Sequence, residues 1–420
     1  MTLLLDSYVT DWLDLLFRWL HVIAGIVWIG TSFYFVALDN HLRSPESRMD
    51  RDAGVGGESW EIHGGGFYRV LKYRLAPETV PEPLHWFKWE AYTTWLSGFA
   101  LMIVLYYVDA DTYLVDKSVR DLDTQTAIGI SLVGLVAAWF VYDAICRVFR
   151  RSELLIAASV IALVAVSAWG ASELFSARAM PIQVGAMLGT IMVGNVFFVI
   201  IPGHWQLVRA RRAGRDPDPR HALRGKQRSV HNNYLTLPVV LAMLGPHFSF
   251  AFARERGWIV LVVLMLVGAW IRLFFNLRHA GRDVWAIPVT AAIAVLVLAW
   301  VIRPDEGEAR ETEQPTTTAA TTTTAPTTTE ANAVPFARVS AIIKERCAPC
   351  HSMNPTQEGF TAPPLGIAFD TPEEISSRAS QIDEQAVRTN AMPLGNVTNM
   401  TDAERELLGR WIEQGANTGP

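Results

Sequence analysis

The sequence is poor in charged residues and in cysteine. Only 18% of its 420 residues are charged and 50% are hydrophobic, a composition far from that of an ordinary soluble protein. The net charge of −5 is small and gives no indication of a nucleic-acid partner. A basic leader is also missing, because acidic residues precede the first apolar run, and we expect that run to stay in the protein. The low share of charged residues and the high share of hydrophobic ones predict a membrane protein whose partner is the lipid bilayer.

Eight apolar stretches are long enough to cross a hydrocarbon core of about 30 Å. They predict an all-α fold, an eight-span transmembrane helical bundle over residues 1–302. The predicted spans are residues 12–38, 85–107, 125–145, 152–172, 181–203, 230–252, 258–276 and 284–302.

Lysine and arginine are distributed unequally between the two sets of connections. The connections after spans one, three, five and seven hold 19 of them, and the opposite set holds 5. Because basic loops stay in the cytoplasm, we expect a multi-pass protein of the cell membrane with both termini on the extracytoplasmic side.

The composition changes abruptly after the eighth span. Residues 303–333 are rich in Thr, Ala, Pro and Glu, and we expect a disordered linker there. Residues 334–420 resemble a globular domain again. Two capping boxes, "TPEE" at 371–374 and "TDAE" at 401–404, predict helix starts in this domain. Three short helices in about 87 residues are typical of a class I cytochrome c.

The stretch "ERCAPCH" at residues 345–351 carries the pattern C-x-x-C-H, which is typical of covalent attachment of a c-type heme. Cys347 and Cys350 are the expected thioether positions, and His351 is the expected axial ligand of the iron. A redox dithiol or half of a zinc site is the alternative interpretation. An extracytoplasmic domain agrees with heme c, which bacteria attach outside the cytoplasmic membrane.

A second axial ligand has to come from the residues after His351. Three methionines are candidates, and Met392 in "NAMPLG" is the favoured one, because the loop before the last helix can fold over the heme face. Met400 directly precedes the last helix, and Met353 follows the heme motif closely. The loop at Pro363 and Pro364 is expected to provide a carbonyl that holds the other nitrogen of His351.

Two histidines fall inside predicted spans, where ionisable groups are costly and tend to face a cavity or a partner. His21 lies in the first span and His247 lies in the sixth, both in the half nearer the extracytoplasmic side. One interpretation is a functional role for the pair. The other is a hydrogen bond from each imidazole to a neighbouring helix.

Polar residues also gather where spans meet the cytoplasmic side. They can line an inner vestibule, or they can simply mark helix ends that meet water. The candidates are Glu90, Gln206, His231, Asn232, Asn233 and Arg272. The glycine run at 64–66, in the long loop after the first span, predicts either close backbone approach to a ligand or a flexible loop. Cys146 has no nearby partner in the sequence, and we expect it to be inert.

Several long stretches resemble the family of membrane-bound, cytochrome-c-linked urate oxidases (urate hydroxylases). The resemblance rests on "LHVIAGIVWIGTSFYFVALDN", "GESWEIHGGGFYRVLKY", "LHWFKWEAYTTWLSG", "GNVFFVIIP" and "HNNYLTLPV", followed by the cytochrome module. It covers residues 10–305 and 334–420. The family implies oxidation of urate to 5-hydroxyisourate in purine degradation, with electrons passing to the chain's own heme and then to a downstream acceptor, a cytochrome or an oxidase.

The resemblance also suggests roles for the polar candidates. Glu90 or a histidine such as His231 would act as the base. Arg272, Gln206, Asn232 and Asn233 would bind the edges of the urate anion. His21 and His247 would either hold a second, non-covalent heme b or line the deep end of the urate pocket.

Two other functions remain open from the sequence alone. The chain can be an electron-transfer subunit of a respiratory complex, in which the bundle anchors a c-type heme. It can also be a transporter with a redox appendage, although the spans show no clear internal repeat.

Overall fold

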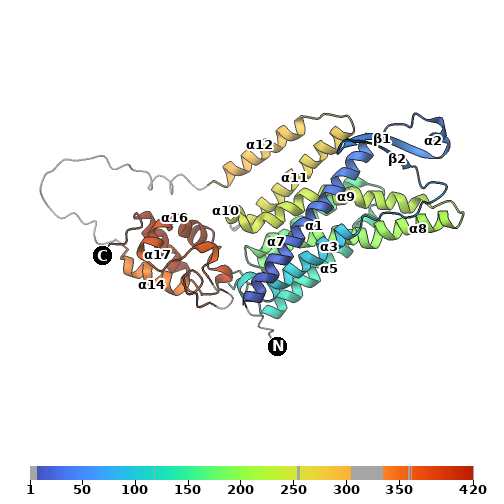
Figure 1. Cartoon of the computed structure of the whole chain (residues 1–420). Helices are drawn as coiled ribbons and strands as arrows, with labels where there is room; N and C mark the ends of the chain where they lie inside the picture. The colour runs from blue at the N-terminus through green and yellow to red at the C-terminus, as the bar shows by residue number, and fades with distance from the viewer. Residues whose placement is uncertain are drawn as a thin grey trace, which may run out of the picture.

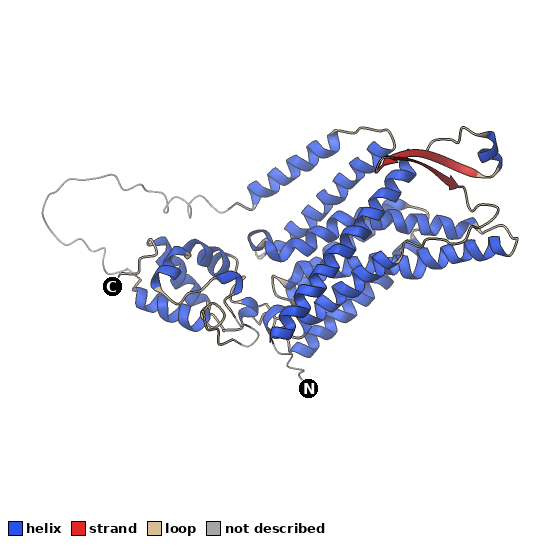
Figure 2. Cartoon of the chain, viewed as in Figure 1, coloured by secondary structure: helices blue, strands red, loops and turns tan. Residues whose placement is uncertain are grey.

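The computed structural model describes residues 7–117, 119–252, 256–303, 334–357, 360 and 362–419. The described chain is mostly helical (Figure 1, Figure 2). Its α-helices are α1 (Ser7–His41), α2 (Arg48–Asp52), α3 (Trp89–Met102), α4 (Ala110–Tyr113), α5 (Thr124–Val148), α6 (Glu153–Leu174), α7 (Ala179–Gly194), α8 (Ile201–Arg212), α9 (Pro219–Leu244), α10 (Ser249–Phe252), α11 (Gly257–His279), α12 (Ala286–Val301), α14 (Phe336–Arg346), α15 (Pro372–Ser377), α16 (Ala379–Ile382) and α17 (Asp402–Glu413). The π-helical segments are η1 (Ile103–Tyr107), η2 (Asn195–Ile200) and η6 (Asp383–Arg388), and the 3₁₀ turns are η3 (Gly245–His247), η5 (Pro364–Gly366) and η7 (Leu394–Asn396).

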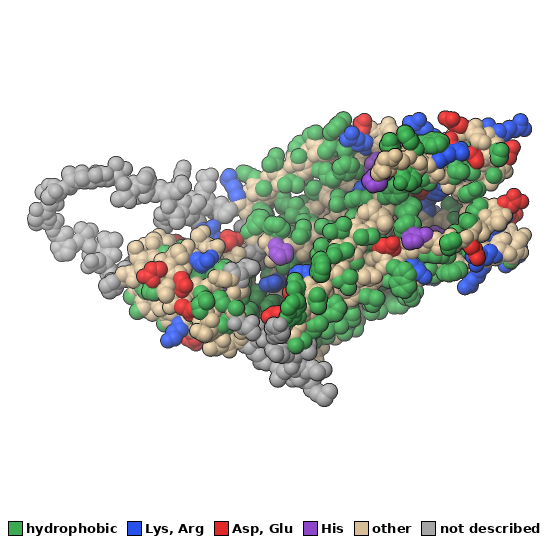
Figure 3. All heavy atoms as spheres, in the orientation of Figure 1, with side chains coloured by type: hydrophobic (Ala, Val, Ile, Leu, Met, Phe, Trp, Pro, Cys, Tyr) green, Lys and Arg blue, Asp and Glu red, His purple; other side chains and the backbone are tan. Residues whose placement is uncertain are grey.

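Residues 7–303 form a helical bundle whose large apolar side chains point outward as well as inward. On α1, Trp19 is 65% exposed and Ile26 is 66% exposed, and on α5 Val133 is 68% exposed. Figure 3 shows hydrophobic side chains covering the visible face of the bundle. Helices that are apolar all round suit a lipid environment, because their backbone polar groups are satisfied internally. The bundle is therefore compatible with a multi-pass membrane protein.

Five helices of the described chain are long and apolar enough to cross a membrane. They are Val9–His41, Thr124–Val148, Glu153–Leu174, Ala179–Arg212 and Gly257–His279. The other three predicted spans also coincide with helices, but α3 has 14 residues before η1, and α12 has 16. The first turns of α9 carry several basic residues, which lowers its mean hydropathy. The count of eight spans stays a prediction.

A β-hairpin interrupts the all-α pattern. Strands β1 (Val55–His63) and β2 (Gly66–Tyr73) pair antiparallel, with His63 opposite Gly66. Gly64 and Gly65 form the turn between them with φ of +56° and +81°. Two consecutive positive φ angles match the twist of a tight hairpin, and glycine adopts them without steric cost. The glycine run is thus a hairpin turn, and the expectation of an entirely helical fold is wrong for this segment.

Residues 334–419, the C-terminal domain, have a hydrophobic core of their own. Val339, Ile343, Leu408 and Trp411 are all nearly inaccessible to solvent. Both predicted capping boxes are confirmed, since Thr371 with Glu374 starts α15 and Thr401 with Glu404 starts α17. The predicted linker lies, apart from Arg303, outside the described residues.

The two ends of the bundle carry different structures (Figure 1). The β-hairpin and the extended parts of α8 and α9 lie at one end, here called the hairpin end. The C-terminal domain lies at the other end, where η7 contacts α4 and η6 contacts α10. The beginning of α1 also lies at this second end. The side of the membrane on which each end lies stays a prediction.

Candidate functional site

The imidazole of His351 is held in one orientation by the C-terminal domain. Its Nδ1 donates a hydrogen bond to the carbonyl oxygen of Ile367 over 2.9 Å, since a carbonyl only accepts. Nε2 is then left as the nitrogen that can ligate iron. The loop at Pro363 and Pro364 was expected to provide this carbonyl. Pro363 precedes the turn η5, Pro364 begins it, and Ile367 directly follows it, so the acceptor belongs to that loop.

The two cysteines of the motif lie in an apolar environment. Burial raises the pKa of Cys347 to about 12 and that of Cys350 to about 11. A redox dithiol depends on a lowered thiol pKa, so these values disfavour that interpretation. Burial also lowers the pKa of His351, against the effect of its bond to Ile367, and the ring is neutral near pH 7 as a metal ligand must be.

Among the residues that the structure describes, no group of three His, Cys, Asp or Glu side chains converges as a metal site, and half of a zinc site stays an alternative. An imidazole held in one orientation beside two neutral thiols suits covalent heme. Cys347, Cys350 and His351 are the residues that would hold it.

The three candidate methionines have different environments. Met353 is 66% exposed, whereas Met400 is 3% exposed and packs in the hydrophobic core. Met392 lies half-buried in the loop between η6 and η7. The guanidinium of Arg405 donates to the carbonyl of Met392 over 2.7 Å and also to that of Ala386, which fixes this loop against α17. Met392 stays the predicted second axial ligand.

Replacing Met392 by alanine is expected to abolish the weak near-infrared band of a methionine–ferric iron bond. Met400→Ala should retain that band and instead lower stability by about 2–5 kcal/mol, because it empties a core position. Near-infrared absorption of the oxidised protein and thermal unfolding separate the two effects. Loss of the band in Met400→Ala with its retention in Met392→Ala would assign the ligand to Met400.

A chain of hydrogen bonds runs through the middle of the bundle toward the surface. Asn195 Nδ2 donates to Tyr142 Oη over 3.0 Å, and Tyr142 Oη lies 2.8 Å from Nδ1 of His231. Nε2 of His231 lies 3.2 Å from Glu153 Oε2, and this carboxylate is 69% exposed. Asn195 Nδ2 also donates to Asn232 Oδ1 over 2.9 Å. We call these five residues the histidine relay.

From Asn195 through Tyr142 and His231 to Glu153, each donor of the histidine relay points toward the exposed carboxylate. A carboxylate accepts only, so Nε2 of His231 carries the proton that is donated to Glu153. Nδ1 then accepts from the Tyr142 hydroxyl, which itself accepts from Asn195. The relay therefore connects the buried interior to the solvent through an imidazole with a carboxylate partner, as in general-base sites.

Backbone geometry places Asn195 in the relay. Asn195 is fully buried and begins η2, the π-helical segment between α7 and α8. A π-helical turn contains an extra residue and re-aims the side chains around it, and such turns are frequent at functional sites.

A cavity of about 490 Å³ opens beside the relay, between α5, η2 with α8, and α9. Its volume is within the range of small-molecule sites. We call it the arginine cavity, because four arginines line it. The lining residues are Asp143, Cys146, Arg147, Arg150, Phe198, Val199, Pro202, Gly203, Gln206, His221, Arg224, Gln227 and Arg228.

Arg228 connects the arginine cavity to the relay. It is 5% exposed; its Nη2 donates to Asp143 over 2.6 Å, and its Cζ lies 4.9 Å from the centre of the Tyr142 ring. Its Nη1 is buried and has no hydrogen-bond partner among the described residues. Cys146 in the wall lies 3.9 Å from Nδ1 of His231. The cavity thus offers a free guanidinium donor one side chain away from a base.

A second polar cluster lies on another face of α9. Nε of Arg272 donates to Asn233 Oδ1 over 2.9 Å, and Nδ2 of Asn276 donates to the same oxygen over 3.1 Å. The guanidinium of Arg272 also lies 3.8 Å from the centre of the Phe33 ring. Arg272 is 3% exposed, and its Nη2 is buried with no hydrogen-bond partner among the described residues. We call this group the Arg272 cluster.

The remaining predicted site residues do not join either cluster. His21 Nδ1 lies 2.9 Å from the carbonyl oxygen of Thr94 and 3.2 Å from Ser97 Oγ, both on α3. His247 lies exposed in the turn η3 and contributes no side-chain hydrogen bond in the described part of the chain. No recorded contact joins the two histidines. Glu90, in the first turn of α3, has a buried Oε2 with no hydrogen-bond partner among the described residues.

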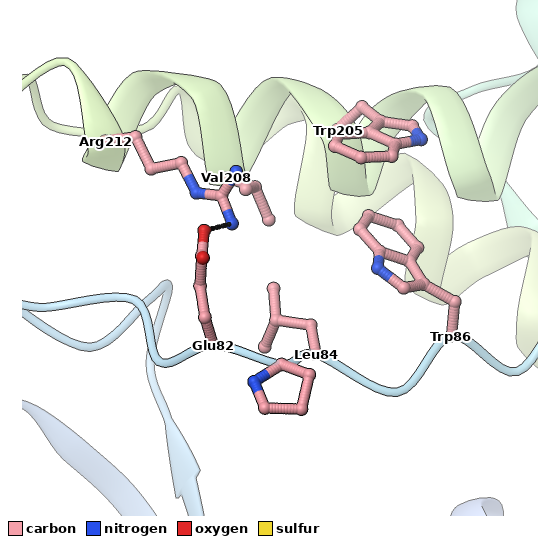
Figure 4. A pocket seen from close by; sticks show the side chains of 7 residues that line it. Glu82, Leu84, Trp86, Trp205, Val208 and Arg212 are labelled. Carbon is pink, nitrogen blue, oxygen red and sulfur yellow. Dashed lines mark ion pairs between the residues drawn. The ribbon is translucent and has the colours of Figure 1, made fainter.

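A smaller cavity of about 380 Å³ lies between the loop before α3 and α8 (Figure 4). Trp86 and Trp205 stack in it with ring centres 4.5 Å apart. Arg212, the cationic residue of this cavity, is already neutralised because it pairs with Glu82 over 2.5 Å (Figure 4). This cavity is less suited than the arginine cavity to an anion.

Sequence reasoning identified His231, Asn232 and Gln206 but missed Tyr142, Glu153, Asn195 and Arg228. Two signals were available. Asn195 is an amide within a long apolar run, and Tyr142 with Asp143 interrupts another. Neither signal shows that these residues meet His231.

Taken together, the fold and the site are compatible with a helical, multi-pass membrane protein with a buried polar relay and a cationic cavity. The family model "Urate oxidase N-terminal" matches residues 7–303, which is most of the chain. The chain therefore belongs to this family, which suggests an oxidoreductase acting on urate. Neither a curated protein nor a solved structure matches it.

Proposed function

We propose that this protein is a membrane-bound urate oxidase that converts urate to 5-hydroxyisourate and passes the electrons to its own c-type heme. One observation carries the proposal beyond the family: Arg228 presents a buried, unpartnered Nη1 at a purine-sized cavity beside the histidine relay. The reaction is urate plus water giving 5-hydroxyisourate, two protons and two electrons. It requires recognition of an anion, a proton acceptor and an electron carrier.

Recognition of the anion is assigned to the arginine cavity. A buried guanidinium without a full set of acceptors favours an anionic ligand, and charge-assisted hydrogen bonds are the stronger ones. Gln206 can donate to or accept from the purine edge, and the ring of Phe198 offers a flat apolar contact. The lining holds four arginines and one carboxylate, Asp143, which makes the cavity cationic.

Proton removal is assigned to His231. Glu153 orients its ring from one side, and the hydroxyl of Tyr142 donates to it from the other. When a proton binds to Nδ1, the ring releases the proton on Nε2 through the exposed carboxylate of Glu153. The imidazole thereby changes from one tautomer to the other. The relay thus delivers protons to the hairpin end, which topology predicts to be cytoplasmic.

Electron transfer is assigned to the C-terminal domain. A heme held by Cys347, Cys350, His351 and Met392 supplies a one-electron carrier when bound. The domain lies at the end of the bundle opposite the hairpin, and a downstream cytochrome or oxidase is the expected acceptor.

We expect urate to reduce the heme in the absence of oxygen. Purified protein is mixed anaerobically with urate in a stopped-flow instrument, and the reduced c-type spectrum should appear with two hemes reduced per urate consumed. A variant with Cys347→Ala and Cys350→Ala serves as the control and should not turn over. Full activity of that variant with stoichiometric hydrogen peroxide would reject the proposal, and reduction by quinol but not urate would favour a respiratory subunit.

The same preparation tests the second heme. From Asn195 to the start of α7 is about 24 Å at 1.5 Å per residue, so electrons from urate in the arginine cavity have most of the bundle left to cross. A heme b between His21 and His247 is one carrier for that distance, and it should appear as one acid-acetone-extractable heme per covalent heme. Turnover with covalent heme alone excludes it and leaves both histidines as candidates for the substrate pocket.

A further inference from the structure

The C-terminal domain meets the bundle through a glycine. Gly395, in the turn η7, lies over the end of α4 with φ of +55°. A Cβ atom built on Gly395 would lie 2.6 Å from the carbonyl oxygen of Val115 and 2.8 Å from those of Asp111 and Thr112. Only a residue without a side chain fits there, because all three obstacles are backbone atoms.

The bundle side of this contact is a helix C-terminus. α4 is a single turn, and the last carbonyls of a helix have no partner within it. The backbone of η7 covers three carbonyls of this region, a close approach at which Cα–H···O contacts are common. Leu114 and Val115 are 0% and 1% exposed, so the segment after α4 is fully covered.

Charge is complementary across the contact. The segment from Asp109 to Lys117 carries three aspartates, and on the other side of the contact the guanidinium of Arg405 donates to Asn396 Oδ1 in η7 over 3.4 Å. Arg405 is the residue that holds the Met392 loop through its carbonyl. A cation of the C-terminal domain thus faces an acidic patch on the bundle.

The contact also involves the heme face of the domain. η7 begins two residues after Met392. The contact at Gly395 is therefore adjacent in the chain to the predicted axial ligand.

We propose that the contact between Gly395 and α4 is the internal electron-transfer interface, which holds the heme face of the C-terminal domain against the bundle. This deepens and rests on the proposed function. While the domain is docked, the bundle covers η7, which lies next to the Met392 loop in the chain. A downstream protein acceptor must then use another face of the domain or wait until the domain leaves the bundle.

Gly395→Asn tests the interface, because asparagine tolerates a positive φ but its Cβ meets the three carbonyls. The matched control is Gly415→Asn, which changes a glycine with φ of +93° on the same domain whose Cβ would meet only Asn417, at 3.7 Å. Hydrogen–deuterium exchange of the peptide 108–117 should accelerate in Gly395→Asn and not in the control. Anaerobic heme reduction by urate should slow about tenfold or more, because the domain is then only tethered.

Three further readouts keep the test decisive. Urate oxidation with a small artificial acceptor should be retained in Gly395→Asn, and the near-infrared band should be unchanged. If that band is lost, Thr112→Arg replaces it as the test, since Thr112 is 2% exposed on the bundle side and is remote in sequence from the heme ligands. Unchanged exchange at 108–117 in both variants would overturn the interface. If urate fails to reduce the heme of the unaltered protein, the proposed function fails while the exchange result still tests docking.

Discussion

Arg228→Gln is expected to raise the KM for urate by about 100-fold, with a smaller change in kcat. The substitution removes a charge-assisted hydrogen bond to the anion, worth about 1.5–3 kcal/mol in a buried site. It also leaves Asp143 with Arg147 as its remaining partner, which weakens the cationic field of the cavity. Initial rates over a wide urate range with an artificial acceptor give both constants.

Two matched variants show which arginine binds urate. Arg150→Gln, at the exposed rim of the arginine cavity, should change KM by less than about threefold, since exposed charges contribute little. Arg272→Gln should lower stability with little effect on KM, because Arg272 lies in the other cluster. The reverse pattern, a large KM effect at Arg272 and none at Arg228, would move the urate site to the Arg272 cluster, with Glu90 as its base. Heme content and thermal unfolding check that each variant is folded.

Helix positions could be predicted because apolar runs and capping boxes are local signals. Thr371 and Thr401 start helices because the cap and its glutamate lie three residues apart. The hairpin escaped prediction because its strands mix apolar and charged residues. Gly64 and Gly65 indicated a turn, but not that the chain pairs on both sides of it.

The candidate site shows where sequence reasoning stops. Asn232 and Asn233 are adjacent in the chain, and we expected them to act together. Successive side chains on a helix point about 100° apart, so Asn232 reaches Asn195 while Asn233 reaches Arg272. The partners of each depend on how α9 packs, which is a tertiary property.

The histidine relay illustrates the same limit. His231 was found as a polar residue at a helix end, whereas Glu153 lies 78 residues away in sequence. Only the packing of α6 against the bundle brings that carboxylate to the imidazole. Cys146 was expected to be inert for lack of a sequence neighbour, yet it lies in the cavity wall beside His231.

His231→Gln is expected to lower kcat by about 100-fold to 10,000-fold, the usual contribution of general acid–base catalysis. Glutamine keeps hydrogen-bonding atoms near those of the imidazole, but it cannot accept and release a proton near neutral pH. Binding is less affected, because the free donor of Arg228 remains, so KM should change by only a few-fold. Rates with an artificial acceptor, together with the affinity for urate measured by titration under anaerobic conditions, separate the two effects.

The pH dependence distinguishes a base from a structural histidine. If His231 is the base, the acidic limb of the kcat/KM profile should disappear in His231→Gln. Glu153→Gln should keep that limb and lower kcat by a smaller factor, about tenfold, since the exposed carboxylate orients the ring and water can replace it in accepting the proton. Tyr142→Phe is the matched control, because it removes the hydroxyl that donates to Nδ1 and keeps the ring under Arg228. An unchanged acidic limb in His231→Gln would place the base elsewhere, with Glu90 the next residue to replace.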